Sequence, residues 1–476
     1  MTTSVIMTSA WRIFLSLLEM TFFTLDQALE ITKAMFGFPF YYLRNNKMPK
    51  KRKRVVIIGA GFAGLTAQRT ICEYGEDEFD VTVIDMKNYF EYTPGILRSF
   101  VNPKHITRLT GKIPSKRNKF IFGEVIGFKR GEPTGELTVK LIDKSTGATK
   151  RTSNDVEEVI HVPYDYLLIG SGSSYEQPIK PQKYETTLQI RKKTIESEYN
   201  KIQKAKAILI IGGGPVGVEL AGEILTQFPN KNVIITDMAK TICPSFPKAS
   251  VDYMTSWLIE HNCELILGTP IGGTFPNGLL IDENGCTLSN DQRINADLVY
   301  KCMGFKATAE FMKTDLGTKH FKGNSLIVDD QLRVLETSNV FGMGDCMIHS
   351  KSNDIKLGHT AEINAHLVVE NIVRLSNNEK LLSYPEGVVN NNHVPHIYCV
   401  SLGEFDGSLC FNNFIINGKI AALMKHILEV SKVAACNERI AGKLFWQLAD
   451  LSSIYISKYL FTTSSAQDKE KLKSKI

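Results

Sequence analysis

A glycine-rich turn that occurs twice constrains the fold of this chain more than any other feature. Each copy follows a run of β-branched apolar residues, in "RVVIIGAGFAGLTAQ" and in "ILIIGGGPVGVELAGEI". Such a run predicts a buried parallel strand, and the G-x-G-x-x-G spacing after it predicts a tight turn, a close backbone approach and a closely packed helix. The glycines of the two turns are Gly59, Gly61, Gly64, Gly212, Gly214 and Gly217.

An acidic residue closes the second strand of each unit, where a dinucleotide ribose would lie. The segment "DVTVID" ends at Asp85, and the segment "NVIITD" ends at Asp237. A carboxylate at this place accepts hydrogen bonds from ribose hydroxyls, and the helix N-terminus after the glycines presents free N–H groups to phosphates. Two complete units therefore predict two dinucleotide sites. Because Asp237 would repel a 2′-phosphate, the second site favours NADH, with NADPH left open.

Three further strands end in glycines: "YDYLLIGSGS" at Gly170, "ADLVYKCMGFK" at Gly304 and "TSNVFGMGDC" at Gly344 and Asp345. With these landmarks the chain resembles the two-dinucleotide-binding-domain flavoproteins of the glutathione-reductase-like superfamily. The resemblance implies that the first turn binds the adenylate of FAD, that Asp345 holds its ribitol, and that the second turn binds NAD(P)H.

The fold class expected is α/β, with two Rossmann-like dinucleotide-binding domains. The NAD(P)H domain, residues 176–304, is inserted into an FAD domain made of residues 54–175 and 305–370. An apolar N-terminal extension, residues 1–53, precedes them. A C-terminal region with amphipathic helices, residues 371–476, follows them.

The stretch after the first unit, "DMKNYFEYTPGILRSFV", distinguishes between branches of the superfamily. Disulfide reductases carry a C-x-x-x-x-C pair there, and this chain has no cysteine in that stretch, which excludes a dithiol mechanism. The stretch is similar to type II NADH dehydrogenases and to the apoptosis-inducing-factor-like, ferroptosis-suppressor quinone reductases. That resemblance implies FAD contacts at Arg98 and, through a backbone group, at Val125.

Two carboxylates are the candidate catalytic residues. Glu219 lies, by the same resemblance, where flavin and nicotinamide meet; the alternative is a helix-N-terminal carboxylate that stabilises the helix dipole. Glu362 lies in "GHTAEINAHLVVENI", where these families run a helix from the flavin toward the quinone. The usual A-Q-x-A-x-Q pattern is absent from this helix, so exact quinone contacts are not implied.

The predicted activity is hydride transfer from NADH to FAD, followed by transfer of two electrons to a membrane quinone. Reduction of a quinone needs a proton source, for which Glu219 is the first candidate and Glu362 the second. Two alternatives stay open: a reductase of ferredoxin or rubredoxin, and an apoptosis-inducing-factor-like redox or signalling flavoprotein.

Composition excludes several other classes. The net charge of +6 does not require nucleic acid, and the nine cysteines are scattered. Neither a metal site nor a disulfide framework is therefore expected, and the odd cysteine count suits a reducing compartment rather than secretion. His359 and His366 are spaced too far apart on a helix to form a metal pair.

Both ends of the chain predict contact with a membrane surface. The segment "WRIFLSLLEMTFFTLDQALEITKAMFGFPFYYL" places Arg12, Glu19, Asp26, Glu30 and Lys33 on one helical face and apolar residues elsewhere. This pattern favours a helix lying in a membrane interface, with packing on the protein's own core as the alternative. The lipid-facing residues expected are Trp11, Phe14, Leu15, Leu18, Phe22, Leu25 and Leu29.

A basic run, "KMPKKRKR", and a second apolar helix within residues 439–461 support the same interpretation. The start is Met-Thr, which excludes N-myristoylation. We therefore expect a peripheral protein on a mitochondrial or cytosol-facing membrane, with a homodimer as an open alternative.

Overall fold

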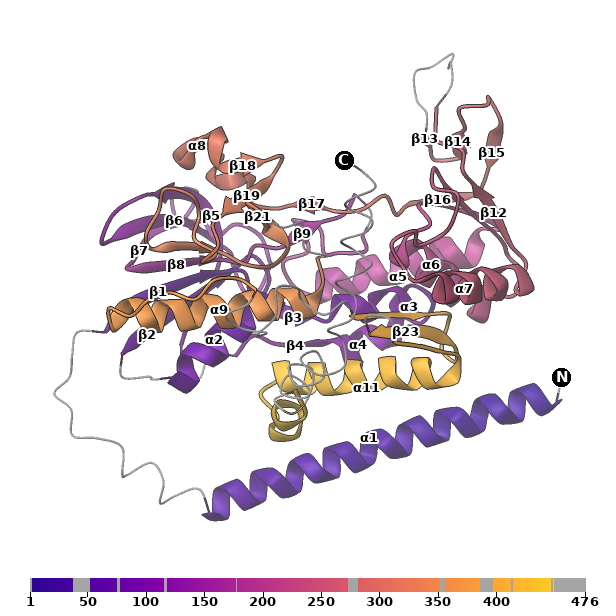
Figure 1. The fold of residues 1–476 in the computed structure, drawn as a ribbon, viewed down its shortest axis with the longest axis horizontal. Coiled ribbons are helices and arrows are strands. Elements are labelled where there is room, and N and C mark those ends of the chain that lie inside the picture. Colours follow the sequence, from indigo (N-terminus) through magenta and orange to yellow (C-terminus); the bar gives the residue numbers. More distant parts are fainter. Residues whose placement is uncertain are drawn as a thin grey trace, which may run out of the picture.

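A computed structural model describes residues 2–36, 52–74, 78–114, 118–176, 178–272, 281–351, 356–385, 397–411, 414–446 and 448. The first unit is a seven-stranded sheet (Figure 1). Parallel pairing joins its first five strands and antiparallel pairing its last three. The strand order is β20 (Val340–Gly342), β8 (Tyr166–Ile169), β1 (Lys53–Ile58), β2 (Phe79–Asp85), β5 (Lys119–Lys129), β6 (Gly135–Leu141) and β7 (Val159–Tyr164).

The second unit has a four-stranded parallel sheet of its own. Its order is β12 (Cys263–Leu267), β11 (Asn232–Asp237), β10 (Ala207–Ile211) and β16 (Leu298–Lys301). A smaller antiparallel sheet adjoins it, formed by β13 (Ile281–Asp282), β14 (Gly285–Thr287) and β15 (Arg293–Asn295). Helices α5 (Leu188–Lys204), α6 (Pro215–Gln227) and α7 (Lys248–Glu260) belong to this half of the molecule (Figure 1).

The chain leaves the first sheet and returns to it. After the second unit, β20 pairs with β8 of the first sheet. The two crossings are β9 (Ser173–Ser174) and β17 (Lys306–Ala307), which pair antiparallel next to the expected limits of the inserted domain. The predicted fold class, with one Rossmann-like unit inserted into another, is confirmed. The expected limit at residue 370 falls inside α9 (Gly358–Ser376), which packs on α2 (Phe62–Tyr74).

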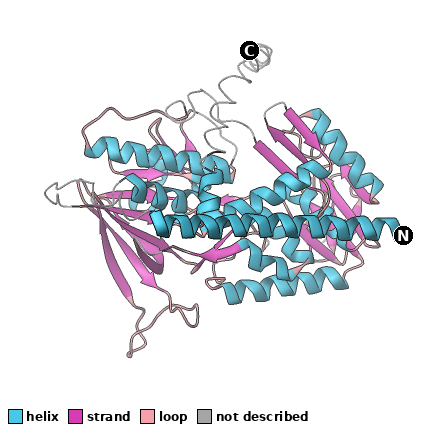
Figure 2. Ribbon diagram, turned by 90° about the horizontal axis from the view of Figure 1, so that it is seen from below, coloured by secondary structure: helices cyan, strands magenta, loops and turns pink. Residues whose placement is uncertain are grey.

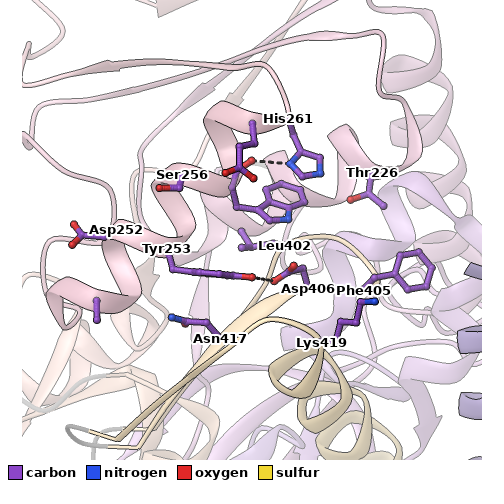
Figure 3. A pocket seen from close by; sticks show the side chains of 13 residues that line it. Thr226, Asp252, Tyr253, Ser256, His261, Leu402, Phe405, Asp406, Asn417 and Lys419 are labelled. Atoms are coloured by element: carbon purple, nitrogen blue, oxygen red, sulfur yellow. Dashed lines mark hydrogen bonds between the residues drawn. The ribbon is translucent and has the colours of Figure 1, made fainter. Parts of the chain in front are cut away.

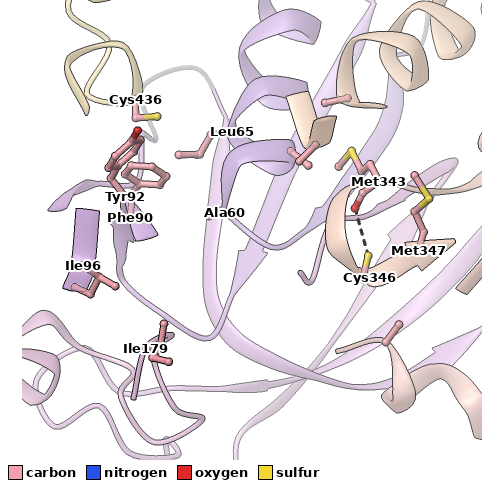
Figure 4. Packing of buried hydrophobic residues seen from close by; sticks show 14 of the residues in the cluster. Ala60, Leu65, Phe90, Tyr92, Ile96, Ile179, Met343, Cys346, Met347 and Cys436 are labelled. Atoms are coloured by element: carbon pink, nitrogen blue, oxygen red, sulfur yellow. Dashed lines mark hydrogen bonds between the residues drawn. The ribbon is translucent and has the colours of Figure 1, made fainter. Parts of the chain in front are cut away.

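The C-terminal region forms a third layer against both units. Strands β22 (Ile397–Ser401), β23 (Gly407–Phe411) and β24 (Phe414–Asn417) pack with α11 (Lys419–Cys436), and α6 and α7 lie against this sheet. Shorter elements complete the fold: β3 (Tyr89–Glu91), α3 (Ile96–Val101), α4 (Ile106–Leu109), β4 (Thr110–Lys112), α8 (Lys313–Leu316), β18 (Phe321–Lys322), β19 (Ser325–Val328) and β21 (Met347–His349). One buried apolar cluster runs through all three layers. Figure 4 shows part of it, including Ala60 and Met343 of the first unit and Cys436 of α11.

The N-terminal helix α1 (Thr2–Phe36) lies along the outside of the C-terminal layer (Figures 1 and 2). Three of its charged side chains point to the body of the protein. Arg12 pairs with Glu404 at 2.8 Å, and Asp26 accepts the Ala441 N–H at 3.0 Å. Glu19 pairs with Arg108 of α4. The helix is therefore attached by its polar side.

This arrangement corrects the expected orientation of the helix. The exposed large apolar residues on α1 are Ile13, Phe14, Leu17, Met20, Phe23 and Leu25, whereas Leu15 is buried against the body. Of the residues expected to face lipid, only Phe14 and Leu25 are in the exposed set. The sequence could show that the charges share one face, but not that the body offers partners of opposite sign.

Other parts of the end segments are outside the described residues: most of the basic run, most of residues 439–461, the tail, and the side chains of Glu30 and Lys33. No helix in the described ranges has the length and apolar character needed to cross a membrane.

Candidate functional site

The first glycine turn has the geometry of a pyrophosphate cradle. Gly59 adopts a φ of +97°, and the Ala60 N–H donates to Asp85 Oδ2 at 2.6 Å. A Cβ on Gly64 would lie 1.8 Å from the Gly59 carbonyl oxygen, so the helix can pack only through glycine. A Cβ on Gly61 would meet nothing within 4 Å. The turn is therefore closed on the protein side and open on the side that a pyrophosphate approaches.

The second turn repeats this construction. Gly212 adopts a φ of +113°, and the Gly213 N–H donates to Asp237 Oδ2 at 2.6 Å. A Cβ on Gly217 would lie 2.0 Å from the Gly212 carbonyl oxygen, and one on Gly214 would meet nothing within 4 Å. The residues present in both turns thus fit a dinucleotide.

A neighbouring strand exit crosses each turn at close range. A Cβ on Gly59 would lie 2.2 Å from the Gly170 carbonyl oxygen, and one on Gly212 would lie 2.4 Å from that of Cys302. Gly304, two residues after Cys302, has a φ of +96° and nothing within 4 Å of a Cβ. The structure therefore places Gly170 beside the first turn and Cys302, two residues before Gly304, beside the second, and the sequence did not indicate the Cys302 carbonyl.

Asp345 lies on the short turn after β20, beside the first glycine turn. Gly344 before it has a φ of +73°, and its N–H donates to Asn364 Oδ1 at 3.1 Å. Asp345 Oδ2 accepts from Ser173 Oγ at 2.7 Å and from Lys180 Nζ at 2.9 Å. Burial opposes ionisation, but Lys180, Ser173 and Lys356 together outweigh it and hold the pKa of Asp345 below its usual value. The site thus has an ionised acceptor, and its predicted role toward the ribitol of FAD stays a prediction. Sequence reasoning missed Lys180.

Aromatic rings line the start of α2. Phe62 packs edge-on against Phe90 and Tyr92, each with a centroid distance of 5.8 Å (Figure 4 labels the latter two). A Cβ on Gly358, at the start of α9, would lie 3.3 Å from the Phe62 ring.

Val125 lies on β5 beyond Phe122, the last residue of that strand to pair with β2. The edge beyond that pairing is where the predicted adenine contact would form.

Glu219 lies buried between the two units. It accepts the Ser401 N–H at 3.0 Å and contacts Lys425 Nζ of α11. Burial raises the pKa of Glu219 despite the nearby ammonium. The phenol of Tyr92 is close enough that Glu219, Glu429 and Glu362 all add to the rise in its pKa that burial causes. Glu219 therefore belongs to the helix after the second glycine turn and lies near Tyr92 of the first site.

Glu362, the second candidate, is in a different state. Lys432 Nζ donates to both carboxylate oxygens at 2.6 Å, and Thr66 Oγ1 donates at 3.2 Å. Lys432 also lies 3.5 Å from the ring centroid of Trp446. Burial would raise the pKa of Glu362, but Lys432 outweighs it and keeps the pKa low. Glu362 is thus held as a carboxylate, which makes it the weaker proton source of the two.

The remaining residues singled out from the sequence are Arg98, His359 and His366. Arg98 pairs with Glu223 of α6 at 3.0 Å and donates to the Gly403 carbonyl at 3.2 Å, so its role toward FAD stays a prediction. Burial lowers the pKa of His359, and it lowers the pKa of His366 to about 4. Among the described side chains, no three of His, Cys, Asp or Glu are placed to share a metal ion.

An open hollow of about 770 Å³ lies between α7 and the β22–β23 turn, away from both glycine turns (Figure 3). Tyr253 donates to Asp406 there at 2.7 Å, and His261 stacks on Trp257 at 3.7 Å. Tyr253, Asp406 and His261 are thus partnered within the protein and do not identify a ligand.

Comparison with known proteins agrees with this geometry. Ferroptosis suppressor protein 1 of Xenopus laevis is 28% identical over 381 residues, which cover 78% of this chain and 92% of that protein. Apoptosis-inducing factor homolog B of Dictyostelium discoideum is 26% identical over 419 residues, covering 81% and 98%. These relatives confirm the resemblance drawn from the motifs.

Two solved structures share the fold. The sulfide:quinone oxidoreductase of Aquifex aeolicus superposes with a TM-score of 0.65 at 16% identity, covering 86% of this chain and 95% of that one. NDH2 of Plasmodium falciparum in complex with NADH gives 0.61 at 14% identity, covering 86% and 99%. Residues 53–365 match the model of one protein family, over a span that contains both glycine turns, Glu219, Asp345 and Glu362. The chain belongs to the pyridine nucleotide-disulphide oxidoreductase family and is an FAD-dependent NAD(P)H oxidoreductase.

Proposed function

We propose that this protein takes hydride from NADH onto bound FAD and passes two electrons to a quinone. Bound FAD would accept a hydride from NADH and would donate the two electrons to the quinone. The chain's own residues bind both nucleotides through Gly61 and Gly214, hold the ribitol at Asp345, and offer a protonatable carboxyl at Glu219. Positioning of this kind can supply a large part of the rate acceleration.

The observation that carries the proposal is the surroundings of Glu219. Glu219 lies buried on the helix that follows the second glycine turn, and it is close to Tyr92, which packs on Phe62 at the start of the first turn's helix. The stretch from Asp85 to Val101 has no cysteine. Electrons therefore leave the flavin without a dithiol relay. The reduced flavin then needs an acceptor that diffuses to it. A quinone is the acceptor named for one solved relative, and the apoptosis-inducing-factor and ferroptosis-suppressor similarity covers most of the chain.

Steady-state NADH oxidation tests the proposal. We expect a short-chain quinone to stimulate turnover well above the rate without acceptor, and ferredoxin to add little. Stimulation by ferredoxin but not by quinone would support the rival reductase. NADH oxidation that no acceptor stimulates would favour a redox-signalling role.

The outward apolar face of α1 supports peripheral attachment to a membrane, where a lipid-soluble quinone lies. Three ion-paired side chains hold the opposite face, so Ile13, Leu17 and Met20 are left uncovered by the protein. Burial of such side chains in lipid yields about 1.5–3 kcal/mol each. On this proposal the protein attaches to a mitochondrial or cytosol-facing membrane. The alternative is that a second copy of the chain covers the exposed apolar face of α1.

Changing Ile13, Leu17 and Met20 to Glu should weaken co-sedimentation with anionic liposomes at least tenfold. The control changes Ile126, Val156 and Val159, exposed apolar residues on the first sheet and its loops, and should bind like wild type. Light scattering without lipid tests the alternative: a wild-type dimer that the α1 variant splits would assign this face to a second copy. Deletion of residues 2–48 should release the protein while short quinones are still reduced.

A further inference from the structure

A narrow cavity lies between Glu219 and His426, the α11 residue that Glu19 of α1 contacts. Its volume is about 10 Å³, which is room for roughly one water molecule. Most of its polar lining consists of groups that ionise: Arg98, Glu219, Glu223, Lys425, His426 and Glu429. A water there would have several donors and acceptors within reach.

The inner end of this cavity connects to Glu219 directly. Ser401 bridges the two α6 carboxylates, because its N–H donates to Glu219 at 3.0 Å and its hydroxyl donates to Glu223 at 3.5 Å. Lys425 Nζ lies 3.1 Å from the same hydroxyl. A proton that reaches Glu223 or the cavity is therefore one short step from Glu219.

The outer end is His426, which is only 7% exposed. Its Nε2 lies 2.8 Å from Glu19 Oε1 of α1, yet it makes no aligned hydrogen bond. The Glu19 side chain is 18% exposed and also contacts Arg108. The series from Glu19 through His426 and the cavity thus links the surface under α1 to the junction of the two units.

The groups around His426 keep its ring neutral. Burial is the main cause that lowers the pKa of His426 to about 4, and Glu429 of its own helix opposes this. Arg108 of α4, Arg98 of α3 and His105 lower the pKa further, and Glu19 faces the ring from α1. A neutral imidazole can accept a proton at one nitrogen and release one from the other.

We propose that His426 transfers protons between Glu19 at the surface and Glu219, through a water in the cavity. The proposal rests on the proposed function, since NADH + H⁺ + quinone → NAD⁺ + quinol takes one proton from solvent per turnover. Glu19 passes that proton to one ring nitrogen while the other nitrogen releases one to the water. The water passes a proton to Glu219, either directly or through Glu223. Glu219 thereby regains the proton that it gave to the quinone. His426 ends neutral, and it acts as a positioning residue because it does not touch the substrates.

The test uses the full-length flavin-loaded enzyme with two acceptors. Quinone reduction consumes a proton, whereas ferricyanide takes electrons alone. His426→Ala should slow quinone-dependent turnover about 100-fold, the scale of a lost proton transfer. NADH oxidation by ferricyanide should stay within about twofold of wild type. Added imidazole should restore much of the quinone rate, and the solvent isotope effect of the variant should rise.

Matched variants separate proton transfer from docking of α1. Glu19→Gln and Asp26→Asn each remove one α1 carboxylate that pairs with an arginine, but only Glu19 contacts His426. Glu19→Gln should slow quinone reduction, and Asp26→Asn should not. His426→Gln keeps the side-chain volume and serves if the alanine variant fails to fold.

Three results overturn the proposal. The first is an unchanged quinone rate in folded His426→Ala or His426→Gln. The second is an equal loss with both acceptors and no response to imidazole, which marks a structural role. The third is a wild-type enzyme that reduces ferricyanide but no quinone, because that result removes the proposed function itself.

Discussion

The two glycine turns are built alike but have different surroundings. In both, an N–H of the turn donates to a strand-end aspartate at 2.6 Å. The first turn lies behind a buried wall of Phe90 and Tyr92 and next to the Asp345–Lys180 pair. The second has exposed neighbours, with Met238 74% exposed and Met303 54% exposed. We expect turn geometry to determine pyrophosphate binding in both sites, and the difference in enclosure to separate a resident cofactor in the first site from an exchanging nucleotide in the second.

The largest expected effect comes from the glycines that touch the turns. Gly64→Ala and Gly217→Ala each push a Cβ to within about 2 Å of a carbonyl oxygen. We expect Gly64→Ala to purify almost without flavin. Gly217→Ala should keep its flavin but lose about 100-fold in the rate of flavin bleaching by NADH. Loss of flavin from both variants would show that the second turn also contributes to flavin binding, against the assignment of one nucleotide to each turn. Gly61→Ala is the control, because its Cβ meets no protein atom and folding should be unchanged.

Removal of the Asp345 carboxylate should act on the first site alone. Asp345→Ala deletes the ionised acceptor beside Ser173 and Lys180, and a charged hydrogen bond contributes about 1.5–3 kcal/mol. The Kd for FAD should rise roughly ten- to a hundredfold, measured by equilibrium dialysis. Full flavin absorbance per chain in this variant would reject the assignment of Asp345 to the ribitol.

Nucleotide choice should depend on the second site alone. Wild-type flavin should be bleached faster by NADH than by NADPH, and Asp237→Arg should narrow or reverse the ratio in stopped-flow measurements. Asp85→Asn is the matched change in the first turn and should leave the ratio alone. Equal rates with both donors in the wild type would count against the role of Asp237.

The smallest effect is a shift in pH dependence. The pKa of Asp345 is held low by Lys180, so its contribution to flavin retention is present above the ordinary carboxyl pKa and is lost only as the pH falls through the lowered value. Lys180→Met removes the ammonium, and burial then raises the pKa of Asp345. The pH at which half the flavin is released should move upward. An unchanged release profile would show that Lys180 has no such role.

The sequence predicted what depends on spacing within one segment. The glycines, Asp85 and Asp237 could be predicted because each hydrogen bond that they make joins two residues of the same βαβ unit. Residues that depend on distant partners could not be assigned: Lys180 meets Asp345, and Lys432 meets Glu362, only after folding. The inward charged face of α1 depends in the same way on Glu404, Arg108 and Arg439.

The pairing of β20 with β8 sets an order of events during synthesis of the protein. A ribosome delivers the N-terminal part first, so the first glycine turn emerges long before Asp345. Until Val340–Gly342 appears, β8 lies at an open sheet edge, the kind of edge that recruits foreign strands. If Asp345 holds the ribitol as predicted, we expect cofactor loading to be a late step in biosynthesis. Chains stalled within the inserted unit would be candidates for quality control rather than partly active enzymes.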